Sequence, residues 1–309
     1  MLFVTSYSDP DLDCIACILG YTEYLSKIGR ISTGVYCGEL NLEVDFVKEY
    51  TNFFPLNKHE GNYIEDDKFI LVDSSDPIRI DRRINVEKIV ELFDHRLTEQ
   101  VSKLKNAKVH IDLVGSCSTL IAEEYLKSNL VPSINVATYL YSAIVSNTVN
   151  FKNSVTTPRD TEVAKWLKTV AGLNDNFTKD MFIAKSNISP DNLYEVLRQD
   201  FAIRPISDKM VGIAQIEMVD INRMSTDLKQ VLLESLVRFY NDNKLDYIFF
   251  NGIDIVEGYN IFYTIDDVSN KLFSRVLNIP DLTPGYKTDA IIMRKQIFHM
   301  IEEYFKSQK

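Results

Sequence analysis

Short apolar runs alternate with helical periodicity along the first half of the chain. Leu2–Thr5 has the pattern of a buried strand, and the apolar positions between Ile15 and Ile28 recur with the 3.6-residue period of a helix. Because strands separated by helices favour parallel βαβ units, we predict an α/β domain built on a parallel sheet. Further strands are expected at 31–36, 68–73, 89–94 and 109–114, and further helices at 41–53, 120–126, 135–148 and 160–173, the last capped by Asp160.

The pattern changes around residues 174–190, which are more polar. Ser189-Pro190 is typical of a helix start, since proline fits the first helical position. This half of the chain predicts a smaller second α/β domain, joined by a linker near 180–190, so that the two domains span 1–182 and 190–309. Its expected elements are a helix after Pro190, a strand at 211–219, a helix at 226–240, strands at 247–255 and 260–265, and a final helix at 291–305.

Composition narrows the class of protein. The chain has 309 residues, which suggests two domains, and its net charge of 34 − 44 = −10 argues against a broad nucleic-acid surface. No apolar run approaches the roughly 20 residues that span a bilayer. The N-terminus lacks the basic flank of a signal peptide, and four cysteines are too few for a disulfide framework. We therefore expect a soluble, cytoplasmic protein that binds neither a nucleic-acid polymer nor a membrane.

Acidic residues follow several of the expected strands. Asp11 and Asp13 come just after the first strand, Asp73 ends the strand at 68–73, and Asp94 ends the next, directly before His95. The carboxyl ends of parallel strands meet at one sheet edge, where ligands bind in α/β folds. Carboxylates and an imidazole converging there suit a pair of hard divalent ions such as Mn²⁺ or Mg²⁺. Each acid taken singly fits a turn or cap residue, and only the four in this order favour a metal site.

Two shorter patterns have alternative interpretations. The CxxC spacing of Cys14 and Cys17 can indicate zinc or redox chemistry. No second pair completes such a site, so small, packed residues are the favoured interpretation. The segment 115–119, Gly-Ser-Cys-Ser-Thr, is either a helix N-terminus that binds phosphate or a capped helix start with a tight glycine turn.

In their order along the chain and in their residues, these motifs resemble those of the DHH phosphoesterase superfamily. The matching stretches are Ser8-Asp9-Pro10-Asp11-Leu12-Asp13, Leu71-Val72-Asp73, Phe93-Asp94-His95-Arg96 and the segment 114–119. Within that superfamily the chain is similar to the manganese-dependent (family II) inorganic pyrophosphatases and to the prune-type and yeast-type exopolyphosphatases. The stretches 24–29, 38–43, 141–148 and 292–296 add to the pyrophosphatase likeness, so the resemblance covers nearly the whole chain.

The resemblance implies a fold and a set of site residues. The fold would be α/β, with an N-terminal parallel-sheet DHH domain, a smaller C-terminal DHHA2-like domain, and an active site in the cleft between them. The implied catalytic and metal-binding residues are Asp11, Asp13, Asp73, Asp94 and His95, with Asn147 as a further metal ligand and Arg96, Arg204, Arg294 and Lys295 as substrate-binding residues.

Several positions depart from the pattern of the resembled family. Tyr7 stands where its first motif has a metal-binding histidine, and Arg96 replaces the second histidine of Asp-His-His, as it does in prune-type relatives. Asn147 replaces a metal-binding aspartate. Ala202 and Met293 stand where the family has phosphate-binding basic residues.

The implied function is metal-dependent hydrolysis of a phosphoanhydride bond, in pyrophosphate or short polyphosphate, by a metal-activated water. Two Mn²⁺ or Mg²⁺ ions would serve as cofactors, the partner would be a small phosphate-rich substrate, and a homodimer is possible. The departures keep two alternatives open. One is a nucleotide phosphodiesterase of the same superfamily, and the other is a non-catalytic relative with a binding or regulatory role.

Overall fold

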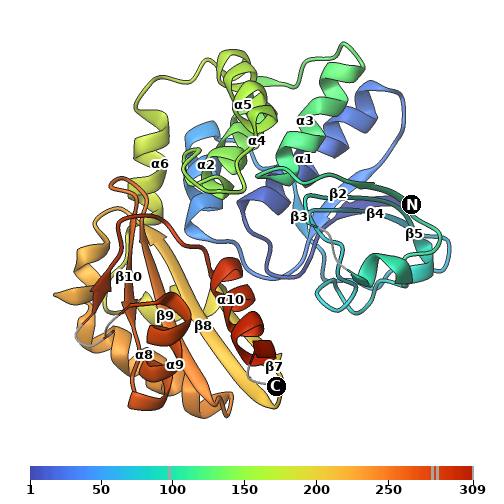
Figure 1. Cartoon of the computed structure of the whole chain (residues 1–309). Coiled ribbons are helices and arrows are strands. Elements are labelled where there is room, and N and C mark those ends of the chain that lie inside the picture. The colour runs from blue at the N-terminus through green and yellow to red at the C-terminus, as the bar shows by residue number, and fades with distance from the viewer. Residues whose placement is uncertain (97–98, 280–281, 283–284, 308–309) are drawn as a thin grey trace. The chain divides into compact units, whose positions relative to one another are not determined.

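The computed structural model describes residues 1–96, 99–279, 282 and 285–307. The chain divides into two compact units, Met1–Ala184 and Lys185–Lys309, called here the first and second units (Figure 1). The boundaries expected from the sequence, at 182 and 190, flank this division. Within the described residues, no helix combines the length and the apolar character needed to cross a bilayer.

The first unit is built on a six-stranded sheet in the order β3-β2-β1-β4-β5-β6, in which every pair of neighbours is parallel. The predicted parallel sheet is thus confirmed. The strands are β1 (Leu2–Thr5), β2 (Thr33–Tyr36), β3 (Asn57–Lys58), β4 (Lys68–Val72), β5 (Ile89–Asp94) and β6 (Lys108–Ile111). The helices are α1 (Leu12–Lys27), α2 (Leu42–Thr51), α3 (Cys117–Lys127), α4 (Ile134–Asn147), α5 (Pro158–Ala171) and α6 (Phe177–Lys185), with 3-10 turns at Val86–Lys88 and Glu99–Lys103.

The two faces of this sheet are covered differently. Helices α1, α3, α4 and α5 lie together on one side of it (Figure 1). On the other side, Phe3, Phe69 and Leu71 pack against loop residues such as Ile80 and Leu104 rather than against a long helix. The loop between β4 and β5 is therefore part of the core, and it begins directly at the predicted site residue Asp73.

The second unit contains a five-stranded mixed sheet in the order β11-β10-β9-β8-β7. Only β8 and β9 are parallel, and the other neighbours are antiparallel. Its elements are α7 (Leu193–Gln199), β7 (Phe201–Ile206), β8 (Lys209–Met218), a 3-10 turn (Ile221–Ser225), α8 (Lys229–Asp242), β9 (Tyr247–Asp254), β10 (Tyr259–Tyr263), α9 (Asp267–Leu277), β11 (Tyr286–Lys287) and α10 (Arg294–Ser307).

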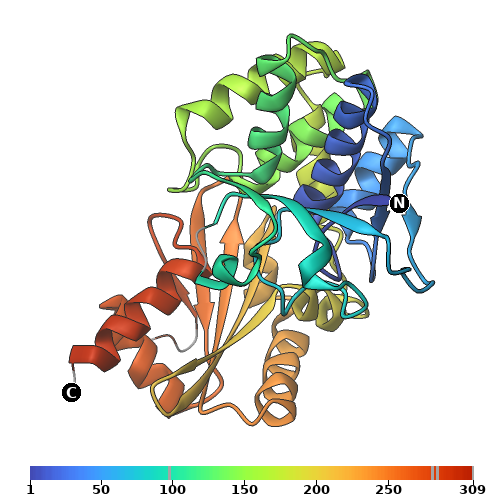
Figure 2. The same cartoon turned by 90° about the vertical axis from the view of Figure 1, so that its right-hand side faces the viewer.

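Alternation along the strands gives this second sheet two apolar faces. Ile216 of β8 and Phe250 of β9 pack with α7 and α8. Ile213 and Phe249, which point the other way, pack with α9 and α10. Figure 2 shows the red C-terminal helix α10 and the orange helix α8 on opposite sides of the strands. The result is a three-layer α/β/α unit.

Some sequence expectations were wrong in detail. The helix expected at 160–173 begins at Pro158 with Thr157 as its N-cap, and Asp160 is the third residue of a capping box. The helix expected to start at Ser189-Pro190 is α7, which starts at Leu193. The expected linker near 180–190 begins inside helix α6. The helices α6 and α9, the strand β7 and the two-residue strands β3 and β11 were not predicted.

Asp160 also joins distant parts of the first unit. Its side chain is fully buried, and its Oδ2 accepts hydrogen bonds from the backbone N–H of Gly115 (2.9 Å) and of Thr157 (2.7 Å). Its Oδ1 accepts one from the hydroxyl of Thr119 (2.6 Å). Asp160 therefore satisfies donors at the start of both α3 and α5, and fixes the loop that carries Gly115.

We expect Asp160→Asn to lower the free energy of unfolding by about 3 kcal/mol, because the amide replaces one acceptor oxygen with a donor that faces the buried N–H and hydroxyl donors. The measurement is urea unfolding followed by far-ultraviolet circular dichroism. Asp175→Asn is the matched control, since the Asp175 side chain is fully exposed, and it should unfold like the parent. Equal midpoints for the two variants would contradict this role for Asp160.

Candidate metal centre

The ends of three neighbouring strands bring the predicted acidic residues to one edge of the first sheet. Asp11 is the N-cap of α1, where its side chain accepts a hydrogen bond from the N–H of Cys14 (3.0 Å), and Asp13 lies in the first turn of that helix. Asp73 follows β4 with a left-handed backbone (φ +52°), and Asp94 is the last residue of β5. The acids at the carboxyl ends of the parallel strands therefore lie at one edge of the sheet, as predicted.

Two groups of potential ligands share Asp73. In one, single ligand atoms of Asp13, Asp73 and His95 all lie within 4.8 Å of one another. In the other, atoms of Asp11, Cys14 and Asp73 do the same. Oxygen and imidazole donors at this spacing can surround a divalent cation of the Mn²⁺ or Mg²⁺ type, so the first group fits the predicted metal.

His95 is oriented as a metal-binding histidine is. Its Nδ1 lies 3.1 Å from the carbonyl oxygen of Val114, to which it donates when the ring is neutral, and its Nε2 lies 3.4 Å from Oδ1 of Asp73. Burial lowers the pKa of His95, with the Asp13 carboxylate opposing the shift. A neutral ring held through Nδ1 directs the lone pair of Nε2 towards the acidic cluster, and metal-binding histidines are usually held in this way by a hydrogen bond from their other ring nitrogen.

Asp13 is the most heavily hydrogen-bonded of these acids. It accepts from the hydroxyls of Ser116 (2.9 Å) and Ser118 (2.6 Å) and from the N–H groups of Cys117 (2.9 Å) and Ser118 (2.9 Å). These donors form the start of α3, so Asp13, which belongs to α1, satisfies the N-terminal donors of a different helix. Together with Asp160, it engages the donors of segment 115–119, and the structure favours the capped helix start over a free phosphate cradle there.

Asn147, the predicted additional ligand, is the last residue of α4. Its Nδ2 donates a hydrogen bond to Oδ2 of Asp13 (2.6 Å). An aspartate at this position could not donate to Asp13 and would repel it. The amide thus stabilises the carboxylate arrangement by itself, and its Oδ1 is the atom that remains to bind a cation.

Arg96 enters the cluster as a permanent cation. Its Nη2 donates to Oδ1 of Asp73 (2.8 Å) and to the carbonyl oxygen of Asp73 (2.7 Å), and its Nε donates to Oδ1 of Asp94 (3.1 Å). The guanidinium therefore bridges the acids that follow β4 and β5. We did not foresee these ion pairs from the sequence, since Arg96 was expected only to bind substrate.

The acids in this cluster titrate in different directions. Burial raises the pKa of Asp73 well above its usual range, and the neighbouring Asp13 and Asp11 add to that rise while Arg96 opposes it. Burial acts on Asp94 in the same way, but Arg96, Ser75 and His95 together outweigh it and lower the pKa of Asp94. An additional cation beside Asp73 would therefore favour its ionised form.

The two cysteines of the CxxC spacing, Cys14 and Cys17, lie in the interior of the first unit. Both are free and fully buried. The thiol of Cys14 accepts from the hydroxyl of Ser6 (2.7 Å) and donates to Oδ2 of Asp73 (3.3 Å), so it borders the acidic cluster. Burial raises the pKa of Cys14 well above its usual range, as do Asp11 and Asp73. Both residues are packed, as favoured from the sequence, and Cys14 also touches the site.

The remaining predicted substrate-binding residues belong to the second unit. Arg204 lies on the edge strand β7, stacks on the ring of Phe298 (4.7 Å to its centroid) and approaches Glu302 (3.5 Å). Arg294 begins α10 and pairs through Nη2 with Oδ1 of Asp200 (2.6 Å), and Lys295 follows it. Asp200 was not predicted as a site residue, because the residues around it in the sequence do not indicate that it pairs with an arginine 94 residues later.

Comparisons with known proteins agree with this fold. The family model of the DHHA2 domain matches residues 179–304. The manganese-dependent inorganic pyrophosphatase of Methanothrix thermoacetophila is 25% identical over 309 residues, covering 99% of this chain and 98% of its own. A Clostridium acetobutylicum protein named "Probable manganese-dependent inorganic pyrophosphatase" is 25% identical and covers 89% of each chain.

Solved structures give the same result. A Methanococcus jannaschii protein, provisionally named a family II inorganic pyrophosphatase, superposes with a TM-score of 0.77 at 25% identity over 99% of this chain and 100% of its own. An exopolyphosphatase-related protein of Bacteroides fragilis, with a TM-score of 0.51 and 13% identity over 99% and 93% of the two chains, shares the fold alone.

The fold and the site define a two-domain α/β protein in which acids and a histidine, the residue types that bind divalent metal ions, cluster at the edge of the parallel sheet. The comparisons then specify the relationship. The second unit matches the DHHA2 domain model, and the chain is similar over almost its whole length to manganese-dependent and family II inorganic pyrophosphatases, which confirms the resemblance stated from its motifs.

We expect Arg96→Gln to bind Mn²⁺ about tenfold more tightly than the parent, because removing the guanidinium leaves Asp73 and Asp94 more negative towards an added cation. The measurement is a calorimetric titration of the metal-free protein with Mn²⁺. Arg159→Gln is the control, since Arg159 pairs with Asp112 and Glu123 in the same unit but touches none of the cluster acids. Unchanged or weaker binding by Arg96→Gln would show that Arg96 does not compete with a metal.

Proposed function

We propose that this protein is a manganese-dependent hydrolase of phosphoanhydride bonds, acting on pyrophosphate or a short polyphosphate. The observation that carries the proposal is the group formed by Asp13, Asp73 and His95, with their ligand atoms within 4.8 Å and the histidine held through Nδ1. The names of the relatives support the same activity and the same metal.

In this proposal Asp11, Asp13, Asp73, Asp94 and His95 are the metal-binding and catalytic residues, with the amide oxygen of Asn147 as a further ligand. Bound Mn²⁺ supplies Lewis-acid polarisation of phosphoryl oxygens and lowers the pKa of water towards neutrality. Asp73, shared by both groups of ligands, is the residue on which two ions would depend. A mixed oxygen and nitrogen ligand set suits Mn²⁺ at least as well as Mg²⁺.

The basic residues have separate roles. Arg96 already lies in the cluster and is proposed to stabilise charge that develops on the transferred phosphoryl group. Arg204, Arg294 and Lys295 are proposed to bind further phosphate oxygens. Since Arg294 is paired with Asp200, substrate must compete with that carboxylate for its guanidinium.

The expected partner is a small, phosphate-rich anion. The four free cysteines favour a reducing compartment, and we infer the cytoplasm as the place of action. A homodimer stays a prediction, as does an active site shared by the two units.

A second candidate is a degenerate relative that binds phosphate or metal without hydrolysis. Arg96 within the cluster and Asn147 in place of an aspartate favour it, because both reduce the negative charge that holds metal ions. A nucleotide phosphodiesterase is the other alternative. The three candidates can be distinguished by their substrates. The main proposal predicts hydrolysis of pyrophosphate or short polyphosphate, the phosphodiesterase predicts hydrolysis of a nucleotide phosphodiester, and the degenerate relative predicts no hydrolysis.

The experiment is Mn²⁺-dependent phosphate release from pyrophosphate and tripolyphosphate, with a nucleotide phosphodiester in parallel. We expect Asp73→Asn to lower the rate about a thousandfold, the scale of losing metal-assisted charge stabilisation, and to lower the bound Mn²⁺ measured by mass spectrometry. Asp112→Asn is the matched control, because Asp112 also follows a strand of the sheet but pairs outwards with Arg159. Mn²⁺ bound by the parent without phosphate release from any substrate would establish the non-catalytic alternative.

A further inference from the structure

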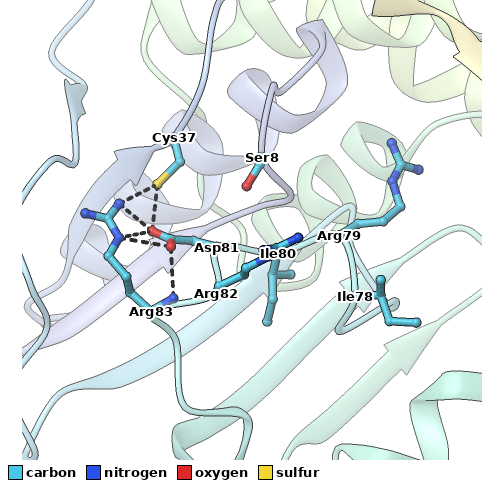
Figure 3. A pocket seen from close by; sticks show the side chains of 8 residues that line it. All are labelled: Ser8, Cys37, Ile78, Arg79, Ile80, Asp81, Arg82 and Arg83. Atoms are coloured by element: carbon cyan, nitrogen blue, oxygen red, sulfur yellow. Dashed lines mark hydrogen bonds and ion pairs between the residues drawn. The ribbon is translucent and has the colours of Figure 1, made fainter. Parts of the chain in front are cut away.

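A pocket that is open to solvent lies in the first unit, and none of the acids or the histidine of the candidate metal centre line it. Its volume is about 520 Å³, and it is formed by the turn after β1, the end of β2 and the loop after β4 (Figure 3). Neither the sequence motifs nor the proposed function uses it. Its lining residues are Ser8, Cys37, Ile78, Arg79, Ile80, Asp81, Arg82 and Arg83.

The wall of this cavity is positively charged. Arg83 is neutralised by Asp81, whose Oδ1 and Oδ2 each lie 2.9 Å from Nε, and it also donates to the carbonyl oxygens of His59 (2.7 Å) and Gly61 (2.6 Å). Arg79 and Arg82, by contrast, are exposed, and no described residue accepts a hydrogen bond from either guanidinium. The wall therefore retains two positive charges that are paired with no carboxylate of the described residues.

The thiol in this wall does not offset that charge. Burial, together with Asp81, raises the pKa of Cys37 to about 11, so the group stays a neutral thiol near neutral pH. The hydroxyl of Ser8 points towards the arginine-bearing loop (Figure 3) and provides a neutral donor beside the cations. Guanidinium and hydroxyl donors, beside a carboxylate that is already paired with Arg83, are the chemistry that binds phosphate.

Tyr7 connects this cavity to the candidate metal centre. The guanidinium carbon of Arg79 lies 4.3 Å from the centroid of the Tyr7 ring, a cation–π contact. The backbone fixes the same pair, because Tyr7 forms a bridge with Ile80 and the N–H of Ser8 donates to the carbonyl oxygen of Arg79 (2.9 Å). The Tyr7 ring therefore determines where the Arg79 guanidinium lies.

The other side of Tyr7 faces the acids. Burial raises the pKa of the Tyr7 hydroxyl well above its usual range, and the nearby Asp11, Cys14 and Asp73 raise it further. The buried Tyr7 ring therefore contacts Arg79 on the pocket side and is influenced by the charges of Asp11 and Asp73 on the side of the cluster.

We propose that Ser8, Arg79 and Arg82 form a phosphate subsite beyond the metal centre, which binds the outer phosphoryl groups of a chain longer than pyrophosphate. The proposal rests on the proposed function and specifies its substrate class. A diphosphate held at the cluster has no further phosphoryl group to extend past Tyr7, whereas the third phosphate of tripolyphosphate, or of a nucleoside triphosphate, can reach the arginines.

The first test compares two substrates on the Mn²⁺-loaded full chain. We expect Arg79→Gln to raise the ratio of the KM for tripolyphosphate to the KM for pyrophosphate about tenfold, the scale of losing one charge-assisted contact to phosphate. Arg79→Lys keeps the charge but not the planar fork, and should fall between the parent and Arg79→Gln. A ratio that stays within about twofold of the parent in Arg79→Gln overturns the subsite.

The matched control is Arg238→Gln. Arg238 is also exposed and stacks on a tyrosine, with its guanidinium carbon 3.9 Å from the ring centroid of Tyr194, but it belongs to α8 of the second unit. It tests whether loss of any stacked surface arginine changes the ratio. The same rise in Arg238→Gln as in Arg79→Gln would assign the effect to net charge and overturn the proposal.

The second test separates this subsite from the hydrolytic function. Tripolyphosphate binding to the metal-free chain, measured by calorimetry, needs no turnover, and ATP in a parallel titration shows whether a nucleoside at the far end is accepted. Binding of either ligand that weakens about tenfold in Arg79→Gln supports the subsite even if no substrate is hydrolysed. Absence of binding to the parent, or equal binding by both proteins, overturns it while leaving the metal centre unaffected.

Discussion

Buried carboxylates at one sheet edge repel one another, and this repulsion is the constraint that organises the first unit. Asp13, Asp73 and Asp94 are each about 1% exposed, so water screens them little. Each is therefore placed beside hydrogen-bond donors or a cation. Asp13 receives the N–H groups and hydroxyls at the start of α3, whereas Asp73 and Asp94 share the guanidinium of Arg96. Helix placement and site electrostatics are thus parts of one arrangement.

The departures from the resembled family act in the same direction. Arg96 adds a positive charge where a second histidine stands in that pattern, and Asn147 removes a negative charge while donating to Asp13. Both changes let the protein balance its own acids without a metal ion. A cluster that is already partly neutral gains less from each divalent cation, so we expect these substitutions to lower metal affinity, although the ligand atoms of Asp13, Asp73 and His95 still lie within 4.8 Å of one another.

Local patterns made much of this fold predictable. Alternating runs and the carboxyl-end rule need only neighbouring residues, and they placed the parallel strands and brought Asp11, Asp13 and Asp73 to one edge. The unpredicted strand β7 lies at the edge of its sheet and contains Pro205, which weakens a strand pattern but is tolerated where no further strand pairs. Helix α6 has few buried residues and polar flanks, so its period was obscured.

The electrostatic contacts of the site could be predicted less well from the sequence, for a different reason. The contacts that matter join residues far apart in the chain, such as Asp13 with Ser118 and Arg79 with Tyr7. Sequence motifs reported the loss of a histidine at Tyr7 but carried no sign that its ring would hold a guanidinium. A resemblance transfers the positions of a family's residues, and it cannot supply new partners at positions where the chain departs from that family.

Which cations are already paired decides how this chain can distinguish phosphate ligands. Arg294 lies on Asp200 and Arg204 approaches Glu302, so a phosphate that binds either must first replace a carboxylate, and part of the attraction is lost in that exchange. Arg79 and Arg82 have no such partner among the described residues, and the stacking on Tyr7 limits the conformational entropy that Arg79 loses on binding. A ligand long enough to reach the unpaired arginines therefore gains more per contact than one confined to the paired ones. Selectivity for chain length then follows from the distribution of carboxylates rather than from the number of basic residues.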